Sequence, residues 1–254
     1  MAPRPAALLW DVDGTLAETE DQGHRPAFNA AFRDAGLPWQ WDSELYHRLL
    51  AVSGGRERLA RFLRDREGRT PDAALLDELV ERKQSHYLRL VRQGCCALRP
   101  GVSHLLQEAA AAGLPQAIVT TSSRRAVKAL AEGVLGQELG PVFAFWICGE
   151  DVAVKKPDPS AYTLAVERLG LPAATLLAIE DSPQGLAAAS AAGVGCLISL
   201  SSLSRSEPTR RFEAALAVVE NLSGGEGPVM VRRGPACPGN RVTLRYLQRL
   251  SSPA

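Results

Sequence analysis

The chain opens with an apolar run, and similar runs return from about residue 114 onward. The first is Ala6-Ala7-Leu8-Leu9-Trp10, between Pro5 and Asp11. A short uninterrupted apolar run of this kind is typical of a strand that is buried on both faces of a parallel sheet. The same pattern predicts further strands at Leu114–Thr121, Val142–Cys148, Leu176–Ile179, Gly195–Ser199 and Ala214–Val219.

Amphipathic or alanine-rich segments separate the later runs. They predict helices over Val102–Ala112, Arg124–Leu135, Ser160–Leu169 and Gln184–Ala192. Because strand and helix alternate regularly here, the expected fold class is α/β, with a doubly wound parallel sheet.

Residues 21–93 break this alternation. Their pattern contains no convincing strand, so we expect an all-helical insert between the first and second core strands. Arg99-Pro100-Gly101 marks the return to the core, since Pro and Gly punctuate elements. The helices expected in the insert are Pro26–Ala35, Ser43–Leu50, Gly55–Arg66 and Ala73–Val91.

The segment after Leu222 is rich in Gly and Pro through Gly239, and Val242–Leu250 then predicts a short helix. The chain is therefore expected to divide into three parts. Residues 1–17 and 97–222 form the core, residues 18–96 a helical cap, and residues 223–254 a C-terminal extension that packs on the core.

Composition excludes several classes of protein. The hydrophobic fraction of 46% and the charged fraction of 22% are those of an ordinary globular chain. A formal net charge of +1 provides no field for nucleic acid or an anionic membrane, and the first apolar run is too short for a signal peptide or a membrane span. The five cysteines lack Cys-x-x-Cys or zinc spacing, which indicates free thiols in a reducing compartment. We expect a cytoplasmic monomer that binds neither nucleic acid nor membrane.

Two carboxylates follow the first predicted strand, in Asp11-Val12-Asp13-Gly14-Thr15-Leu16. In open α/β sheets, ligands bind at the carboxyl ends of the strands. By itself the string also fits a turn rich in Asp and Gly. A calcium loop fits less well, because the other acidic ligands are missing and a strand precedes the string.

Polar residues end three later strands and together supply what phosphoryl transfer needs. Thr121-Ser122 offers donors for phosphate oxygens, although it also suits a helix N-cap. Lys156, in Lys155-Lys156-Pro157-Asp158-Pro159, offers a cation, although a solvated lysine pair is the simpler alternative. Glu180-Asp181-Ser182 places two carboxylates where a hard divalent cation would stabilise them.

In this order and on these elements, the strings resemble motifs one to four of the haloacid dehalogenase superfamily, over essentially the whole chain. The resemblance implies a Rossmann-like core with an inserted helical cap. It implies that Asp11 attacks phosphorus to form an aspartyl-phosphate and that Asp13 acts as general acid and then general base. It also implies that Mg²⁺ is bound by Asp11, the Asp13 carbonyl, Glu180 and Asp181. The phosphate would be contacted by Thr121, Ser122, Ser123 and Lys156. Asp151 would orient Lys156 or a metal-bound water, although it could equally be a surface carboxylate.

Cap segments resemble the CbbY family, which is associated with the Calvin cycle. They include Leu16-Ala17-Glu18-Thr19-Glu20, Gly23-His24-Arg25-Pro26-Ala27-Phe28-Asn29 and Ser53-Gly54-Gly55-Arg56-Glu57-Arg58. The resemblance implies a small phosphorylated sugar as substrate, xylulose 1,5-bisphosphate, dephosphorylated at its first carbon. Arg56, with His24 and Arg25, would bind the second phosphate, and Glu18 and His24 the hydroxyls.

Each of these cap residues has a simpler interpretation. Arg56 could be a solvated helix residue, and it stands where the family pattern has Lys; His24 could be a capping or packing residue, and Glu18 a surface partner. Three other functions share these motifs: a phosphosugar mutase of the β-phosphoglucomutase type, a phosphoglycolate phosphatase, and a phosphometabolite sensor without catalysis.

Overall fold

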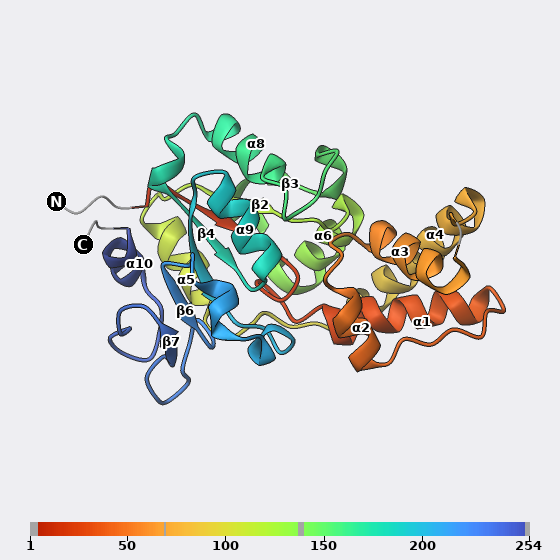
Figure 1. Cartoon of the computed structure of the whole chain (residues 1–254). Coiled ribbons are helices and arrows are strands. Elements are labelled where there is room, and N and C mark those ends of the chain that lie inside the picture. Colours follow the sequence, from red (N-terminus) through yellow and green to blue (C-terminus); the bar gives the residue numbers. More distant parts are fainter. Residues whose placement is uncertain (1–4, 69, 137–139, 252–254) are drawn as a thin grey trace.

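The structure is a computed structural model that describes residues 5–68, 70–136 and 140–251, and a seven-stranded sheet forms the larger of its two bodies (Figure 1). The strands are β1 (Ala7–Trp10), β2 (Gln116–Val119), β3 (Phe143–Ile147), β4 (Leu176–Glu180), β5 (Gly195–Ser199), β6 (Ala217–Val219) and β7 (Val231–Arg233). Their order is β3-β2-β1-β4-β5-β6-β7. All neighbours pair in parallel except β6 and β7, which are antiparallel.

Successive side chains of the central strand β1 point to opposite faces of the sheet, and all are fully buried. Leu8 and Trp10 pack in a core cluster with α5 (Val102–Ala111), α6 (Arg124–Leu130) and α10 (Leu244–Leu250). Ala7 and Leu9 pack in another with α8 (Ser160–Leu169) and α9 (Pro183–Ala191). Helices therefore cover both faces, which confirms the predicted doubly wound α/β fold.

The smaller body is helical and lies beyond the carboxyl ends of the central strands (Figure 1). It contains a π-helical turn, η1 (Glu20–His24), and the helices α1 (Arg25–Asp34), α2 (Ser43–Leu49), α3 (Gly55–Glu67) and α4 (Ala73–Arg92). We call Glu20–Arg92 the cap. Its buried side chains form a core of their own: Phe28, Phe32, Trp41, Tyr46, Leu59, Leu63, Leu76 and Leu79.

Two parts of the predicted layout need comment. The Gly- and Pro-rich tail, in which no strand was predicted, contains β7, and Tyr246 and Leu247 of α10 join the core cluster beside α5. Helix α6 ends at Leu130 and continues as a π-helical turn, η2 (Ala131–Leu135). The three predicted domain boundaries stay predictions, and residues 1–4 and 252–254 at their outer limits lie outside the described residues.

The shorter elements are 3₁₀ turns: η3 (Gly140–Val142), η4 (Gly149–Asp151), η5 (Ala173–Thr175), η6 (Ser204–Ser206) and η7 (Thr209–Phe212). Within the described ranges, every helix is too short or too polar to cross a lipid bilayer.

Strand register brings the motif residues together. Trp10 of β1 is paired with Ile118 of β2 on one side and with Ile179 of β4 on the other. Because the three strands run in parallel and are in step, the residues that follow them emerge at the same edge of the sheet, next to the cap.

Candidate active site

A buried lysine joins two of the predicted carboxylates. Asp11 follows β1, and its backbone N–H donates to the Ile179 carbonyl, which fixes it at the sheet edge. The Lys156 ammonium donates to Asp11 Oδ1 at 2.8 Å and to Glu180 Oε1 at 2.6 Å. Burial lowers the pKa of Lys156, but the two carboxylates outweigh burial and raise it above its ordinary value. Lys156 is therefore a buried cation that is hydrogen-bonded to the Asp11 carboxylate.

Three acidic residues crowd the same edge. Oxygen atoms of Asp11, Glu180 and Asp181 all lie within 4.8 Å of one another. Burial and the neighbouring Glu180 raise the pKa of Asp11 to about 8, and burial with Asp11 and Glu180 raises the pKa of Asp181 well above its ordinary value. Lys156 offsets only part of this repulsion. A buried set of carboxylate oxygens with excess negative charge is the donor set that suits Mg²⁺.

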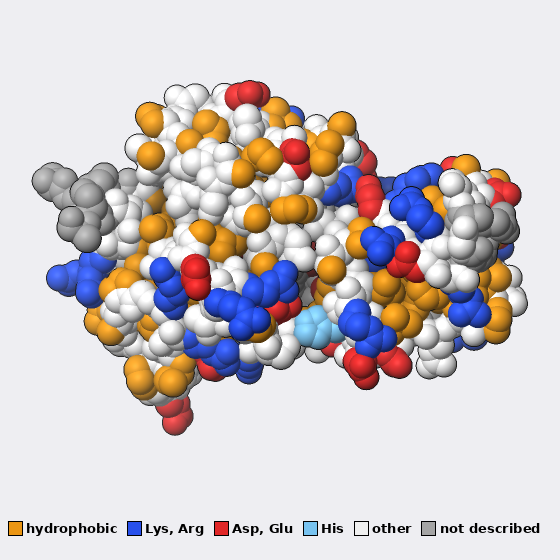
Figure 2. Space-filling view, viewed as in Figure 1, with side chains coloured by type: hydrophobic (Ala, Val, Ile, Leu, Met, Phe, Trp, Pro, Cys, Tyr) orange, Lys and Arg blue, Asp and Glu red, His pale blue; other side chains and the backbone are white. Residues whose placement is uncertain are grey.

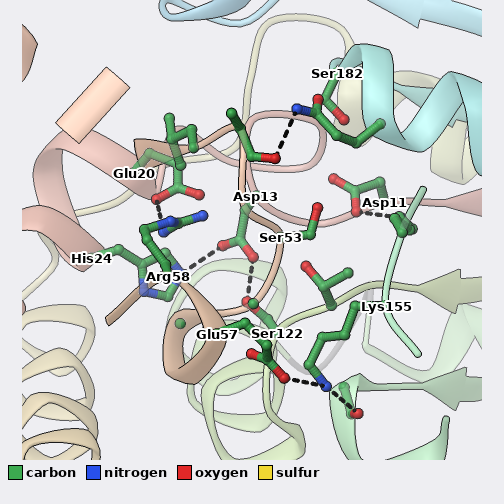
Figure 3. Close-up of a pocket in the computed structure, with 18 of the residues that line it drawn as sticks. Asp11, Asp13, Glu20, His24, Ser53, Glu57, Arg58, Ser122, Lys155 and Ser182 are labelled. Atoms are coloured by element: carbon green, nitrogen blue, oxygen red, sulfur yellow. Dashed lines mark hydrogen bonds and ion pairs between the residues drawn. The ribbon is translucent and has the colours of Figure 1, made fainter. Parts of the chain in front are cut away.

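Asp13 receives hydrogen bonds from three sides. Its Oδ1 accepts from the Thr19 hydroxyl and lies 2.9 Å from His24 Nε2, and its Oδ2 accepts from the Ser122 hydroxyl (Figure 3). Burial alone would raise the pKa of Asp13, but His24, Ser122 and Thr19 hold it well below its ordinary value. Asp13 is thus held as an ionised carboxylate by the donors around it.

Lys83 contacts His24 at the ring nitrogen that does not face Asp13. Lys83 Nζ lies 2.8 Å from His24 Nδ1, and burial lowers the pKa of Lys83 to about 8. An ammonium only donates, so Nδ1 accepts and Nε2 carries the hydrogen that faces Asp13. The imidazole also stacks on the Tyr87 ring at 4.1 Å and 8°. Gly23 permits this approach, because a Cβ there would lie 2.9 Å from the Tyr87 ring.

A cavity of about 660 Å³ separates the sheet edge from the cap and contains these groups (Figure 3). Thr121, Ser122 and Ser123, which follow β2, form part of its wall. Ser123 caps α6 and also donates to Gln84 Oε1 in the cap at 3.2 Å. Figure 2 shows Lys and Arg side chains on both sides of the junction where the two bodies meet.

The cap contributes three arginines to the cavity lining, Arg48, Arg56 and Arg58. Arg56, near the start of α3, is half exposed and donates to Asp77 Oδ1 through Nε and Nη2. Arg58 is buried and donates to the Tyr46 hydroxyl at 2.9 Å, and its Nη1 lies 3.8 Å from Glu20 Oε2 (Figure 3). Arg56 keeps a side chain that can turn toward a ligand, whereas Arg58 belongs to a fixed polar network in the cavity wall.

Two residues predicted to bind substrate lie elsewhere than expected. Glu18 does not reach the cavity: its carboxylate lies beside Arg99 and accepts from Ser202. Arg25 is held at 2.8 Å by Asp21 and lines a separate hollow on the outside of the cap. The Asp21–Arg25 pair is local, at i,i+4 spacing, whereas the partners of Glu18 come from distant segments of the chain.

Asp151 orients neither Lys156 nor the acidic cluster. Its Oδ2 accepts from the Cys148 backbone N–H at 2.7 Å and from Arg124 Nη2 at 2.5 Å, so it caps the turn η4. The simpler interpretation, a structural surface carboxylate, is correct here.

Lys83 and Arg58 are cavity residues that the sequence did not single out. A signal for Lys83 was present, because it lies on the same helical stripe as Leu76, Leu79 and Tyr87. A charged residue within an apolar stripe needs a buried partner, and here that partner is His24. No comparable signal marks Arg58, which resembles the other arginines of α3 in sequence.

Comparisons with known proteins agree with this geometry. Residues 5–193 match the family model of haloacid dehalogenase-like hydrolases. The plasmid-encoded protein CbbY of Cupriavidus necator is 42% identical over 227 residues, which cover 88% of this chain and 88% of that protein. A phosphoglycolate phosphatase of Pectobacterium atrosepticum is 34% identical over 186 residues, 73% of this chain and 76% of its own.

A solved structure is similar over most of the chain. It is a variant of CbbY from Rhodobacter sphaeroides in complex with xylulose 1,5-bisphosphate, 39% identical to this chain with a TM-score of 0.78. The match covers 85% of this chain and 94% of that one.

Proposed function

Because the chain belongs to the haloacid dehalogenase-like hydrolases, and among them to the CbbY family of phosphatases, we propose that it removes one phosphate from xylulose 1,5-bisphosphate with Mg²⁺ as cofactor. The observation that carries the proposal is the meeting of Asp11, Lys156 and the acidic cluster under a cavity whose cap side carries arginines. The bisphosphate bound to the related CbbY supports the choice of sugar.

The first step is attack on phosphorus. An Asp11 carboxylate oxygen forms a bond to phosphorus while the bond from phosphorus to the sugar oxygen breaks, so the phosphoryl group moves onto the enzyme. Lys156, Thr121 and the backbone of Ser122 neutralise the phosphoryl oxygens during the transfer. The departing alkoxide takes a proton from Asp13.

Asp13 needs a supply for that proton, because its hydrogen bonds favour the ionised carboxylate. His24 Nε2, at 2.9 Å, and the Lys83 ammonium behind it provide a route. In the second step the ionised form is what is needed: Asp13 takes a proton from water, the water oxygen attacks phosphorus, and Asp11 and inorganic phosphate are released.

Mg²⁺ would be held by the carboxylates of Asp11, Glu180 and Asp181 and by the Asp13 carbonyl. When bound, it reduces the repulsion between the Asp11 carboxylate and the phosphate dianion. The raised pKa of Asp11 and of Asp181 fits this role, since both are carboxyls that the protein alone does not fully stabilise as anions.

Mg²⁺ affinity should rise with pH up to about 8. Below that value the proton on Asp11 competes with the ion, so affinity should fall by about tenfold per pH unit toward pH 6. Calorimetric titration with Mg²⁺, repeated in buffers of different ionisation enthalpy, measures both the affinity and the released proton. Asp11→Asn is the control, since it has no proton to release there. Equal affinity across this pH range in the wild type would contradict the expectation.

A phosphate-release screen tests the substrate. Xylulose 1,5-bisphosphate should be turned over much faster than ribulose 1,5-bisphosphate and give xylulose 5-phosphate. The two sugars differ in configuration at one carbon, so selection must come from directed hydrogen bonds to a hydroxyl. Faster turnover of phosphoglycolate, or interconversion of a hexose phosphate without phosphate release, would exclude this substrate.

Arg56 should matter for bisphosphates alone. Arg56→Ala is expected to lower kcat/KM for xylulose 1,5-bisphosphate by roughly 10- to 100-fold, the loss of a charged hydrogen bond to the second phosphate. Turnover of p-nitrophenyl phosphate, which has no second anion, should change little. Arg61→Ala is the matched control, because Arg61 lies on the same helix and pairs with Asp65 on the surface. Equal losses on both substrates would assign Arg56 to cap structure.

A further inference from the structure

Another buried cation lies where the cap joins the sheet body. Arg99 follows the cap, and its side chain is 2% exposed. Its Nη1 donates to the Gly14 carbonyl at 2.6 Å and to the Ser199 carbonyl at 2.9 Å. Its Nη2 donates to the Leu200 carbonyl and to Asn221 Oδ1. One guanidinium thus joins segments that are far apart in the sequence.

Both connections between sheet body and cap meet at this arginine. Arg99 Nε lies 3.0 Å from Glu18 Oε1, so the two side chains form an ion pair. The angle at Nε does not meet the geometry of a hydrogen bond. The Arg99 backbone N–H donates to the Leu16 carbonyl, and Ala17 bridges to Leu98. Glu18 in turn accepts from Ser202 in the loop after β5. The two connecting segments are therefore tied to each other and to that loop.

The Gly14 peptide that Arg99 holds is part of the reaction site. Gly14 follows Asp13 directly and has a φ of +82°, a backbone conformation that other residues rarely adopt. A Cβ at Gly14 would lie 2.3 Å from Asp181 Oδ2 and 3.1 Å from Ser201 Cβ. The Gly14 backbone is thus packed against the Asp181 carboxylate, and a shift of this peptide would move Asp13 relative to Asp181.

Arginine suits this position better than lysine. Its planar fork can donate to several acceptors at fixed angles, whereas an ammonium acts as a point charge on a flexible stem. A buried cation also needs partners, which four acceptors around Nη1 and Nη2 and the neighbouring Glu18 carboxylate provide. Arg99 does not line the cavity, so it can act on the reaction only through the groups that it contacts.

We propose that Arg99 is a positioning residue for the phosphatase reaction: by bonding the Gly14 carbonyl and the carboxyl end of β5, it holds Asp13 in register with Asp181. The proposal rests on the proposed roles of Asp13 and Asp181. Glu18, in this view, serves the reaction through Arg99 and contacts no substrate.

Arg99→Lys tests the proposal while keeping the buried charge. With p-nitrophenyl phosphate, kcat should fall by about 10- to 100-fold with a much smaller change in KM, as expected when a residue behind the reacting groups is lost. The Mg²⁺ dissociation constant from calorimetry, which needs no turnover, should rise by a similar factor. Arg125→Met is the control, because Arg125 also links cap and sheet body, through Glu81, but lies on the surface.

The possible results separate the inferences. Wild-type kcat and Mg²⁺ affinity in Arg99→Lys, even with a lowered unfolding temperature, would overturn the positioning role and leave a purely structural one. If Arg99→Lys does not fold, Glu18→Gln provides the same readouts, since it weakens the hold on Arg99 and leaves the carbonyl contacts in place; a smaller loss in both quantities supports the proposal and no loss refutes it. If Asp13→Asn itself retains full turnover, the proposed function fails and this inference fails with it.

Discussion

Asp11→Asn is expected to lower turnover of every phosphate ester by roughly 10⁴-fold or more, because the neutral amide cannot act as nucleophile. The fold should persist. Lys156 keeps its 2.6 Å contact with Glu180, and the substitution removes a carboxylate whose ionisation burial disfavours. The unfolding temperature without Mg²⁺ should therefore equal or exceed that of the wild type. Steady-state kinetics with p-nitrophenyl phosphate and thermal unfolding measure the two expectations.

Asp65→Asn is the matched control for this loss. It makes the same change on the surface of α3, where Asp65 pairs with Arg61, and should leave kcat unaltered. More than trace turnover by Asp11→Asn would rule out the covalent route and point to direct attack by water.

Asp13→Asn should slow the reaction by about 10²–10⁴-fold, the usual contribution of general acid–base catalysis. The loss should differ between steps. A p-nitrophenolate leaves readily without a proton, so the first step should survive with this substrate while hydrolysis of the aspartyl-phosphate becomes slow. Rapid-mixing experiments should then show a burst of p-nitrophenol close to one per active site. With a sugar phosphate, whose alkoxide needs a proton, no burst is expected.

The contrast between substrates makes the assignment of Asp13 testable. A burst with both substrates would mean that another group protonates the alkoxide, and His24 would be the first to examine. Wild-type rates with both would remove Asp13 from the reaction.

The position of the four motif segments was predictable from the sequence. Apolar runs mark the strands, parallel strands end at one edge, and the polar residues that follow Trp10 and Ile179 must then meet there. Lys156 lies well beyond the end of β3, and only the resemblance to the superfamily motifs included it in the site. The meeting of these strand ends thus follows from the hydrophobic pattern and from the rule that neighbouring parallel strands end on the same side of the sheet.

Cap residues were harder to predict, because their neighbours come from distant segments. Glu18 is two residues from Glu20, yet one pairs with Arg99 and the other lines the cavity. Nothing local distinguishes the two carboxylates. Arg56 and Arg58 likewise share a helix, but only the packing of α3 on α2 decides which is buried with Tyr46.

The edge strand β7 escaped prediction for a different reason. It is three residues long, carries Arg232 and Arg233, and follows a stretch rich in Gly and Pro, so its own sequence has little strand character. It forms because β6 offers unpaired backbone groups. Pairing with a neighbour, which a single sequence does not display, is what defines it.

Strand β7 pairs with β6 at what would otherwise be an open edge of the sheet. An open sheet edge is a template on which a second chain can add a strand, and repeated addition leads to aggregates. Here β7 occupies the edge of β6 in the antiparallel sense, and its charged side chains and the adjoining Gly-Pro segment make it a poor template in turn. The C-terminal extension therefore covers the edge of β6, so a strand of a second chain cannot pair with β6 on this side.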